Sequence, residues 1–64
     1  MAVTEEIVKK ACDLETLINW KALMQYMTPI GYKYVNNEPR RYYKNRIGHY
    51  YYRRVSESEV HRNK

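Results

Sequence analysis

The small size of this chain limits what it can fold into more than any other feature of its sequence. A chain of 64 residues hides only about 60% of the surface that it exposes when unfolded, so we expect a single small domain spanning residues 1–64. The core of such a domain is small, and stability at this size commonly needs a staple, a metal or a partner. The single cysteine cannot form an internal disulfide. We therefore expect one domain with little stability to spare.

The N-terminal half carries apolar residues at helical spacing. Thr4 precedes Glu5 and Glu6, an arrangement typical of a helix N-terminus. Two apolar series follow at spacings of three and four, and they lie on different helical faces: Ile7, Ala11, Leu14 and Ile18, then Leu17, Trp20, Met24 and Met27. The shift of face predicts two helices, over residues 4–12 and 14–27, with Asp13 capping the second.

The second apolar series has two interpretations. We expect Trp20, Met24 and Met27 to form part of the core. The alternative is an exposed stripe that binds a partner helix or a second copy of the chain. Cys12 has apolar neighbours, so we expect it to be a small buried hydrophobe in a reducing, cytoplasmic setting.

Beyond this region the sequence favours strands. Residues 28–31 include Pro29 and Gly31 and are predicted to end the helical part. Residues 32–35 and 49–55 are rich in aromatic and β-branched residues and predict two strands, with a turn or cap at residues 36–39. Residues 40–47 fit either a third strand of a meander or a helix that ends at Gly48.

Near the C-terminus, Ser56 and Glu59 have the spacing of a capping box, which predicts a short final helix. Together these patterns predict an α+β fold: an N-terminal helical segment, then an antiparallel β-hairpin or three-stranded sheet, then the short C-terminal helix.

Positive charge is concentrated in the C-terminal half. Residues 1–32 hold three lysines and four acidic residues, whereas residues 33–64 hold nine Lys or Arg and three glutamates. All of the net charge of +5 therefore arises in one half, as in a surface that binds a polyanion. The alternative is a solvated face that only keeps the protein soluble.

Tyrosine alternates with these cations. Residues 31–54 contain seven tyrosines and seven Lys or Arg, a combination that suits nucleic acid, since cations neutralise phosphates and tyrosine rings stack on bases. The chain has no Phe, so we expect about half of the tyrosines to be structural. The residues predicted to bind nucleic acid are Arg40, Arg41, Tyr43, Lys44, Arg46, Tyr51, Arg53 and Arg54.

The sequence offers little material for catalysis or metal binding. His49, His61 and Cys12 do not have a zinc-site spacing. The paired glutamates are explained by helix starts, and no phosphate loop or nucleophile motif is present. We expect neither an enzyme nor a cofactor or metal site, and no apolar run approaches the length of a membrane span.

Residues 46–60, Arg-Ile-Gly-His-Tyr-Tyr-Tyr-Arg-Arg-Val-Ser-Glu-Ser-Glu-Val, resemble the wing and following helix start of small excisionases and mercury-resistance-type winged-helix regulators. The resemblance covers about a quarter of the chain. It implies that Arg40, Arg41, Lys44 and Arg46 lie on or just after a recognition helix, and that Arg53 and Arg54 lie on the wing. It also implies a small accessory factor that binds or bends DNA, as in mobile-element recombination.

The sequence therefore favours binding of double-stranded DNA by a regulatory or recombination accessory factor. A second hypothesis is a protein-interaction module that binds and modulates a larger acidic protein, such as an enzyme acting on nucleic acid, because Tyr and Arg are also enriched at protein interfaces. RNA binding is the third hypothesis. No pattern in the sequence indicates an oligomeric state.

Overall fold

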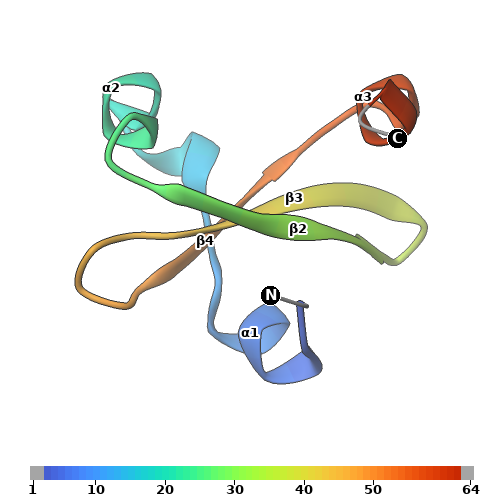
Figure 1. Ribbon diagram of the computed structural model, residues 1–64, viewed down its shortest axis with the longest axis horizontal. Helices are drawn as coiled ribbons and strands as arrows, with labels where there is room; N and C mark the ends of the chain where they lie inside the picture. The colour runs from blue at the N-terminus through green and yellow to red at the C-terminus, as the bar shows by residue number, and fades with distance from the viewer. Residues whose placement is uncertain (1–2, 63–64) are drawn as a thin grey trace.

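The computed structural model describes residues 3–62 and confirms an α+β fold (Figure 1). Its elements, in chain order, are α1 (Glu5–Lys10), β1 (Cys12–Asp13), the 3-10 helix η1 (Leu14–Thr16), α2 (Trp20–Met24), β2 (Thr28–Val35), β3 (Glu38–Lys44), β4 (Tyr50–Arg54) and α3 (Glu57–Arg62).

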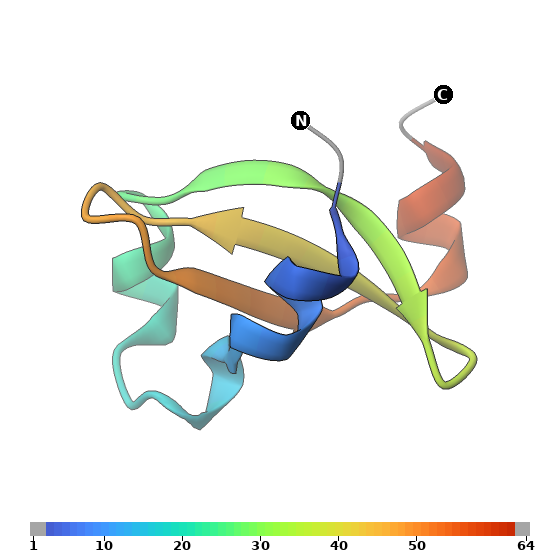
Figure 2. The same ribbon diagram turned by 90° about the horizontal axis from the view of Figure 1, so that it is seen from below.

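The strands form one mixed sheet in the order β1-β4-β3-β2. β2, β3 and β4 make the predicted antiparallel meander, and β1 adds a short parallel edge strand beside β4. Helix α1 lies against one face of the sheet, and α2 and α3 lie on the other face at opposite ends (Figures 1 and 2). We call these the α1 face and the α2/α3 face.

The register of the meander assigns each side chain to a face. Paired residues of antiparallel strands share a face, and neighbours along a strand point to opposite faces. Tyr42 pairs with Tyr52, and Tyr43 pairs with Tyr51. Ion pairs identify the faces: Lys33, which is in register with Arg40, contacts Glu5 of α1 at 3.2 Å, so Arg40 and Tyr42 belong to the α1 face and Tyr43 to the α2/α3 face.

The predicted helix over residues 14–27 is wrong. The chain makes only η1 and the five-residue α2, separated by a loop in which the Ile18 side chain is 98% exposed. Asp13 does act as a cap, but of η1: its Oδ1 accepts a hydrogen bond from the Glu15 amide at 3.1 Å. The two apolar series break apart because β1 and η1 interrupt the helical spacing.

The core is also smaller than predicted. Among the described residues the buried apolar side chains are Ile7, Leu14, Tyr42 and Tyr43. Trp20, Met24 and Met27 are only half-buried. They lie at the margin of the core and not inside it, which corrects the prediction. Cys12, expected to be buried, is exposed, because it belongs to the two-residue edge strand β1.

The helical region ends before residues 28–31, as predicted, and these residues begin β2. Pro29 is tolerated because β2 is an edge strand of the sheet. The register shifts between Pro29 and Gly31, and Gly31 has a φ of 145°. Glycine suits this irregular position because it adopts a positive φ without strain.

Residues 38–44 resolve as the strand β3 rather than a helix. Asn36 and Asn37 have φ values of 53° and 64°, the geometry of a two-residue hairpin turn that asparagine tolerates. This turn pairs Val35 with Glu38 and sets the β2–β3 register. In the β3–β4 turn, residues 45–49, the Asn45 Oδ1 accepts hydrogen bonds from the Ile47 and His49 amides at 3.1 and 2.8 Å.

Two predicted helix starts are confirmed. The Thr4 Oγ1 accepts a hydrogen bond from the Ile7 amide at 3.3 Å, and the Ser56 Oγ accepts one from the Glu59 amide at 3.2 Å. Each satisfies an amide that the first helical turn leaves without an intrahelical partner.

Candidate nucleic-acid interface

The structure divides the predicted binding residues between two faces and a turn. Arg40, Lys44 and Arg54 lie on the α1 face. Four others lie on the α2/α3 face, and Arg46 lies in the β3–β4 turn; the four are Arg41, Tyr43, Tyr51 and Arg53. These residues therefore do not form one continuous surface, because β3 and β4 alternate their side chains between the two faces.

On the α1 face, Arg40 and Arg54 occupy directly paired positions and share a carboxylate. The Nε of Arg40 donates to Glu38 Oε1 at 2.8 Å, and the Nε of Arg54 donates to Glu38 Oε2 at 3.0 Å. Arg54 also donates through Nη1 to Asp13 Oδ2 at 2.7 Å. The Arg40 guanidinium lies over the Tyr52 ring at 4.3 Å, so both arginines are held in place.

These contacts perturb the carboxylates. The hydrogen bond from Arg54 holds the pKa of Asp13 below its ordinary value. The hydrogen bond from Arg40, with the charge of Arg54, holds the pKa of Glu38 below its ordinary value. Both carboxylates therefore stay ionised at neutral pH and offset part of the positive charge of this face.

On the α2/α3 face, Arg41 and Arg53 occupy the next paired positions and share Glu59 of α3. Arg53 Nη2 donates to Glu59 Oε2 at 3.0 Å, and Arg41 Nη1 lies 3.9 Å from the same oxygen. Arg53 Nη2 also lies 3.5 Å from the Tyr43 hydroxyl. Four of the six predicted cations are thus ion-paired within the molecule.

Three cations that lack a carboxylate partner among the described residues lie at one end of the molecule. Lys21 is on α2, Lys44 ends β3, and Arg46 is in the β3–β4 turn. Residues 16–37 and 39–56 contain no Asp or Glu, so we call this part, α2 together with residues 44–49, the acid-free end (Figures 1 and 2). Lys9 also lacks a carboxylate partner there but lies on α1.

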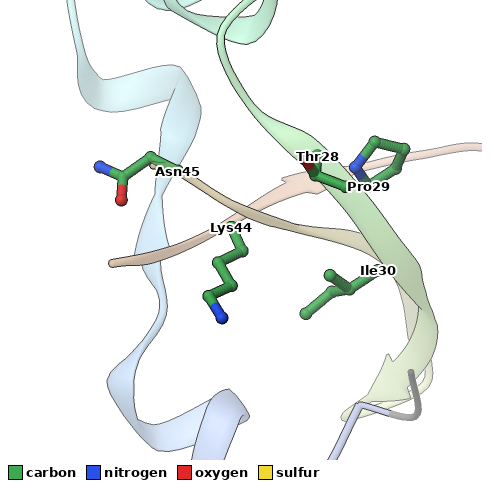
Figure 3. A pocket seen from close by; sticks show the side chains of 5 residues that line it. All are labelled: Thr28, Pro29, Ile30, Lys44 and Asn45. Atoms are coloured by element: carbon green, nitrogen blue, oxygen red, sulfur yellow. The ribbon is translucent and has the colours of Figure 1, made fainter. Parts of the chain in front are cut away.

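Among the hollows that flank the acid-free end, two lie on either side of Asn45. One, of about 460 Å³, lies where β2 begins and β3 ends, and Figure 3 shows Lys44 beside it. The other, of about 250 Å³, lies between α2 and the β3–β4 turn and has mainly apolar walls: Leu23, Tyr26, Met27, Asn45, Arg46, Ile47 and Tyr51. The Tyr26 and Ile47 side chains are 56% and 76% exposed, and the Arg46 guanidinium lies 5.7 Å from the Tyr26 ring.

The two predicted tyrosines do not present open rings. Tyr43 is 3% exposed, which leaves its ring unavailable for stacking on a base. Tyr51 is half-buried and lines the apolar hollow. Sequence reasoning missed Lys21 and Tyr26, because it assigned α2 to a long amphipathic helix. The signal that could have found them is the absence of acidic residues between Glu15 and Glu38.

Within the described part of the chain, no group of three or more His, Cys, Asp or Glu is placed to hold a metal ion. In the same part, every helix is too short or too polar to cross a membrane. Comparison with known proteins gave no match: no family model matches the chain, and no curated protein sequence or solved structure is detectably similar to it.

Proposed function

We propose that this protein binds double-stranded DNA through its acid-free end. The observation that carries the proposal is the pairing pattern of the cations. Lys21, Lys44 and Arg46 have no carboxylate partner among the described residues, whereas the arginines at positions 40, 41, 53 and 54 all do. Unpaired cations gain most from a phosphate, because no internal ion pair has to be broken first.

The shape of this end supports the proposal. The β3–β4 turn projects beside α2 (Figure 2), and a β-hairpin next to a helix is the arrangement that we compare with the wing of winged-helix proteins. Gly48 has a φ of 90° and allows the chain to turn tightly there. The recognition helix implied by the sequence resemblance has no counterpart at residues 38–44, which are β3, so in this proposal α2 is the helix beside the wing. A regulatory or recombination role follows from the same resemblance.

The salt dependence of DNA binding tests the proposal quantitatively. Three neutralised phosphates predict a slope of about −2.7 for the logarithm of affinity against the logarithm of salt concentration, measured by fluorescence anisotropy on a labelled duplex. Engagement of all seven cations of residues 31–54 would give about −6. A slope near −2.7 supports the acid-free end, and no binding at about 50 mM salt would refute DNA binding.

Single substitutions locate the site. Arg46→Gln and Lys44→Gln should each reduce the size of the slope by about 0.9. Lys9→Gln is the matched control, since it removes the same charge from α1, outside the acid-free end. Equal losses from Lys9→Gln and Arg46→Gln would mean a diffuse charge effect rather than a site. An RNA duplex of the same sequence, measured in parallel, tests the RNA hypothesis.

The apolar hollow favours a second candidate function, the binding of an acidic protein. Ile47 is 76% exposed beside Arg46 and Tyr26, and exposed apolar residues next to Arg and Tyr are typical of protein-binding hot spots. A short peptide of Leu and Glu residues should then shift the methyl NMR signals of Ile47 and Leu23. Ile47→Ser should abolish the shift of the Leu23 signals but, because it keeps Lys21, Lys44 and Arg46, leave the salt slope of duplex binding unchanged, which separates the two candidates.

A further inference from the structure

Arg41 and Arg53 face each other across β3 and β4 on the α2/α3 face. They are directly paired in the antiparallel register, so their side chains leave the sheet side by side. Like charges at such positions repel each other and destabilise the strand pair. An anion between the two guanidinium groups removes the repulsion, and the structure supplies one from α3.

That anion is Glu59. Its Oε2 lies 3.0 Å from Arg53 Nη2 and 3.9 Å from Arg41 Nη1. The three side chains are between 20% and 30% exposed, so water screens the contact less than it screens an ion pair on the open surface. Within residues 3–62, Glu59 makes the ion pairs that join α3 to the sheet.

Glu59 does not satisfy all of the hydrogen-bond donors of the Arg41–Arg53 pair. The Nε of Arg53 is buried and has no hydrogen-bond partner among the described residues. One oxygen of Glu59 serves both arginines. A buried donor without a partner is unfavourable, so the geometry suits a ligand with more acceptor oxygens than Glu59 delivers here.

We propose that Arg41 and Arg53 form a phosphate-binding site that Glu59 occupies until a phosphate group displaces it. A phosphate group has enough oxygens to accept from Arg53 through both Nε and Nη2 and from Arg41 at the same time, the bidentate geometry that guanidinium groups favour. The guanidinium of Arg41 lies over the rings of Tyr32 and Tyr43 at 5.5 and 5.6 Å, which orients it toward the site.

Binding at this site requires α3 to move, because Arg53 is shielded while Glu59 is in place. α3 is the last described element of the chain and lies at the opposite end of the sheet from α2 (Figure 1). None of the buried apolar side chains among the described residues belongs to α3, so its displacement removes no member of that core. The site is therefore separate from the acid-free end and does not depend on the function proposed for that end.

Glu59→Gln tests the proposal, because it removes the competing charge with little change of shape. Inorganic phosphate is the probe, and the NMR signals of the Arg41 and Arg53 Nε–H groups report its binding, that of Arg41 also in variants that lack Arg53. We expect Glu59→Gln to bind phosphate about tenfold more tightly than the unmodified protein, as for loss of one charge-assisted hydrogen bond. Arg53→Lys in the Glu59→Gln background should abolish the gain in phosphate affinity. Lysine keeps the positive charge but lacks the paired N–H donors of the guanidinium group.

Two variants control for charge alone. Glu57→Gln removes the same charge from the same turn of α3, and no ion pair joins Glu57 to a described residue. Glu38→Gln removes the same charge from the other arginine pair, on the α1 face, where Asp13 still holds Arg54, so it should not tighten phosphate binding. A gain in phosphate affinity for Glu57→Gln equal to that for Glu59→Gln would overturn the proposal, as would no phosphate binding by Glu59→Gln when circular dichroism shows it to be folded.

A parallel titration with duplex DNA identifies the source of the phosphate. If Glu59→Gln gains affinity for both inorganic phosphate and a DNA duplex, the site accepts a nucleic-acid backbone. A gain for inorganic phosphate alone supports a site for free phosphate. Failure of the unmodified protein to bind duplex would refute the function proposed for the acid-free end but leave the inorganic phosphate result valid, so the two failures are distinguishable.

Discussion

Truncation of Leu14 is the most direct test of where the stability of this protein resides. The Leu14 side chain is 0% exposed and is one of four buried apolar side chains among the described residues. A buried Leu→Ala substitution costs about 2–5 kcal/mol, from lost transfer energy and from the cavity it leaves. A domain of 64 residues has a total stability of about 3–10 kcal/mol. Leu14→Ala should therefore remove about half of the free energy of unfolding or more.

The measurement is urea unfolding followed by circular dichroism. With an m-value of about 1 kcal/mol/M, expected at this size, the midpoint should fall by about 2–5 M, or the variant should be unfolded without urea. Ile18→Ala is the control, since Ile18 is 98% exposed and its loss should change stability by no more than about 0.5 kcal/mol. Equal effects of the two substitutions would refute the assignment of the core to η1 and the central strands.

Acidification should destabilise the fold through Asp13 and Glu38. Because their pKa values are lowered in the folded state, their stabilising effect is full above the unfolded values, near 4, and is lost as pH falls through the folded values. The urea midpoint should fall in that range and depend less on pH in Arg54→Gln; an unchanged pH dependence in that variant would contradict the pairing. Exposed Cys12 should react with a disulfide reagent in the folded protein about as fast as in urea, and protection until unfolding would show that it is buried.

The sequence alone determined the features that depend on a few neighbouring residues. Thr4 and Ser56 cap their helices as predicted, because a cap needs only an oxygen and an amide three residues away. The strand before Asn36 was visible for the same reason, whereas the segment after Asn37 fitted either a strand or a helix until its pairing partners were known. The concentration of positive charge in residues 33–64 was likewise a property of composition.

Only the tertiary structure decided on which face each cation lies and which carboxylate it contacts. Arg40 and Arg41 are adjacent in the sequence, yet the alternation of β3 sends them to opposite faces, where Glu38 and Glu59 neutralise them. Glu38 is two residues from Arg40 on the same face of β3, but Glu59 reaches Arg41 only because of where α3 docks, a long-range contact that no local pattern encodes. The same holds for α2: its apolar spacing fitted a long helix, but β1 pairs with β4 and takes the preceding residues into the sheet, which leaves a short helix beside the β3–β4 turn.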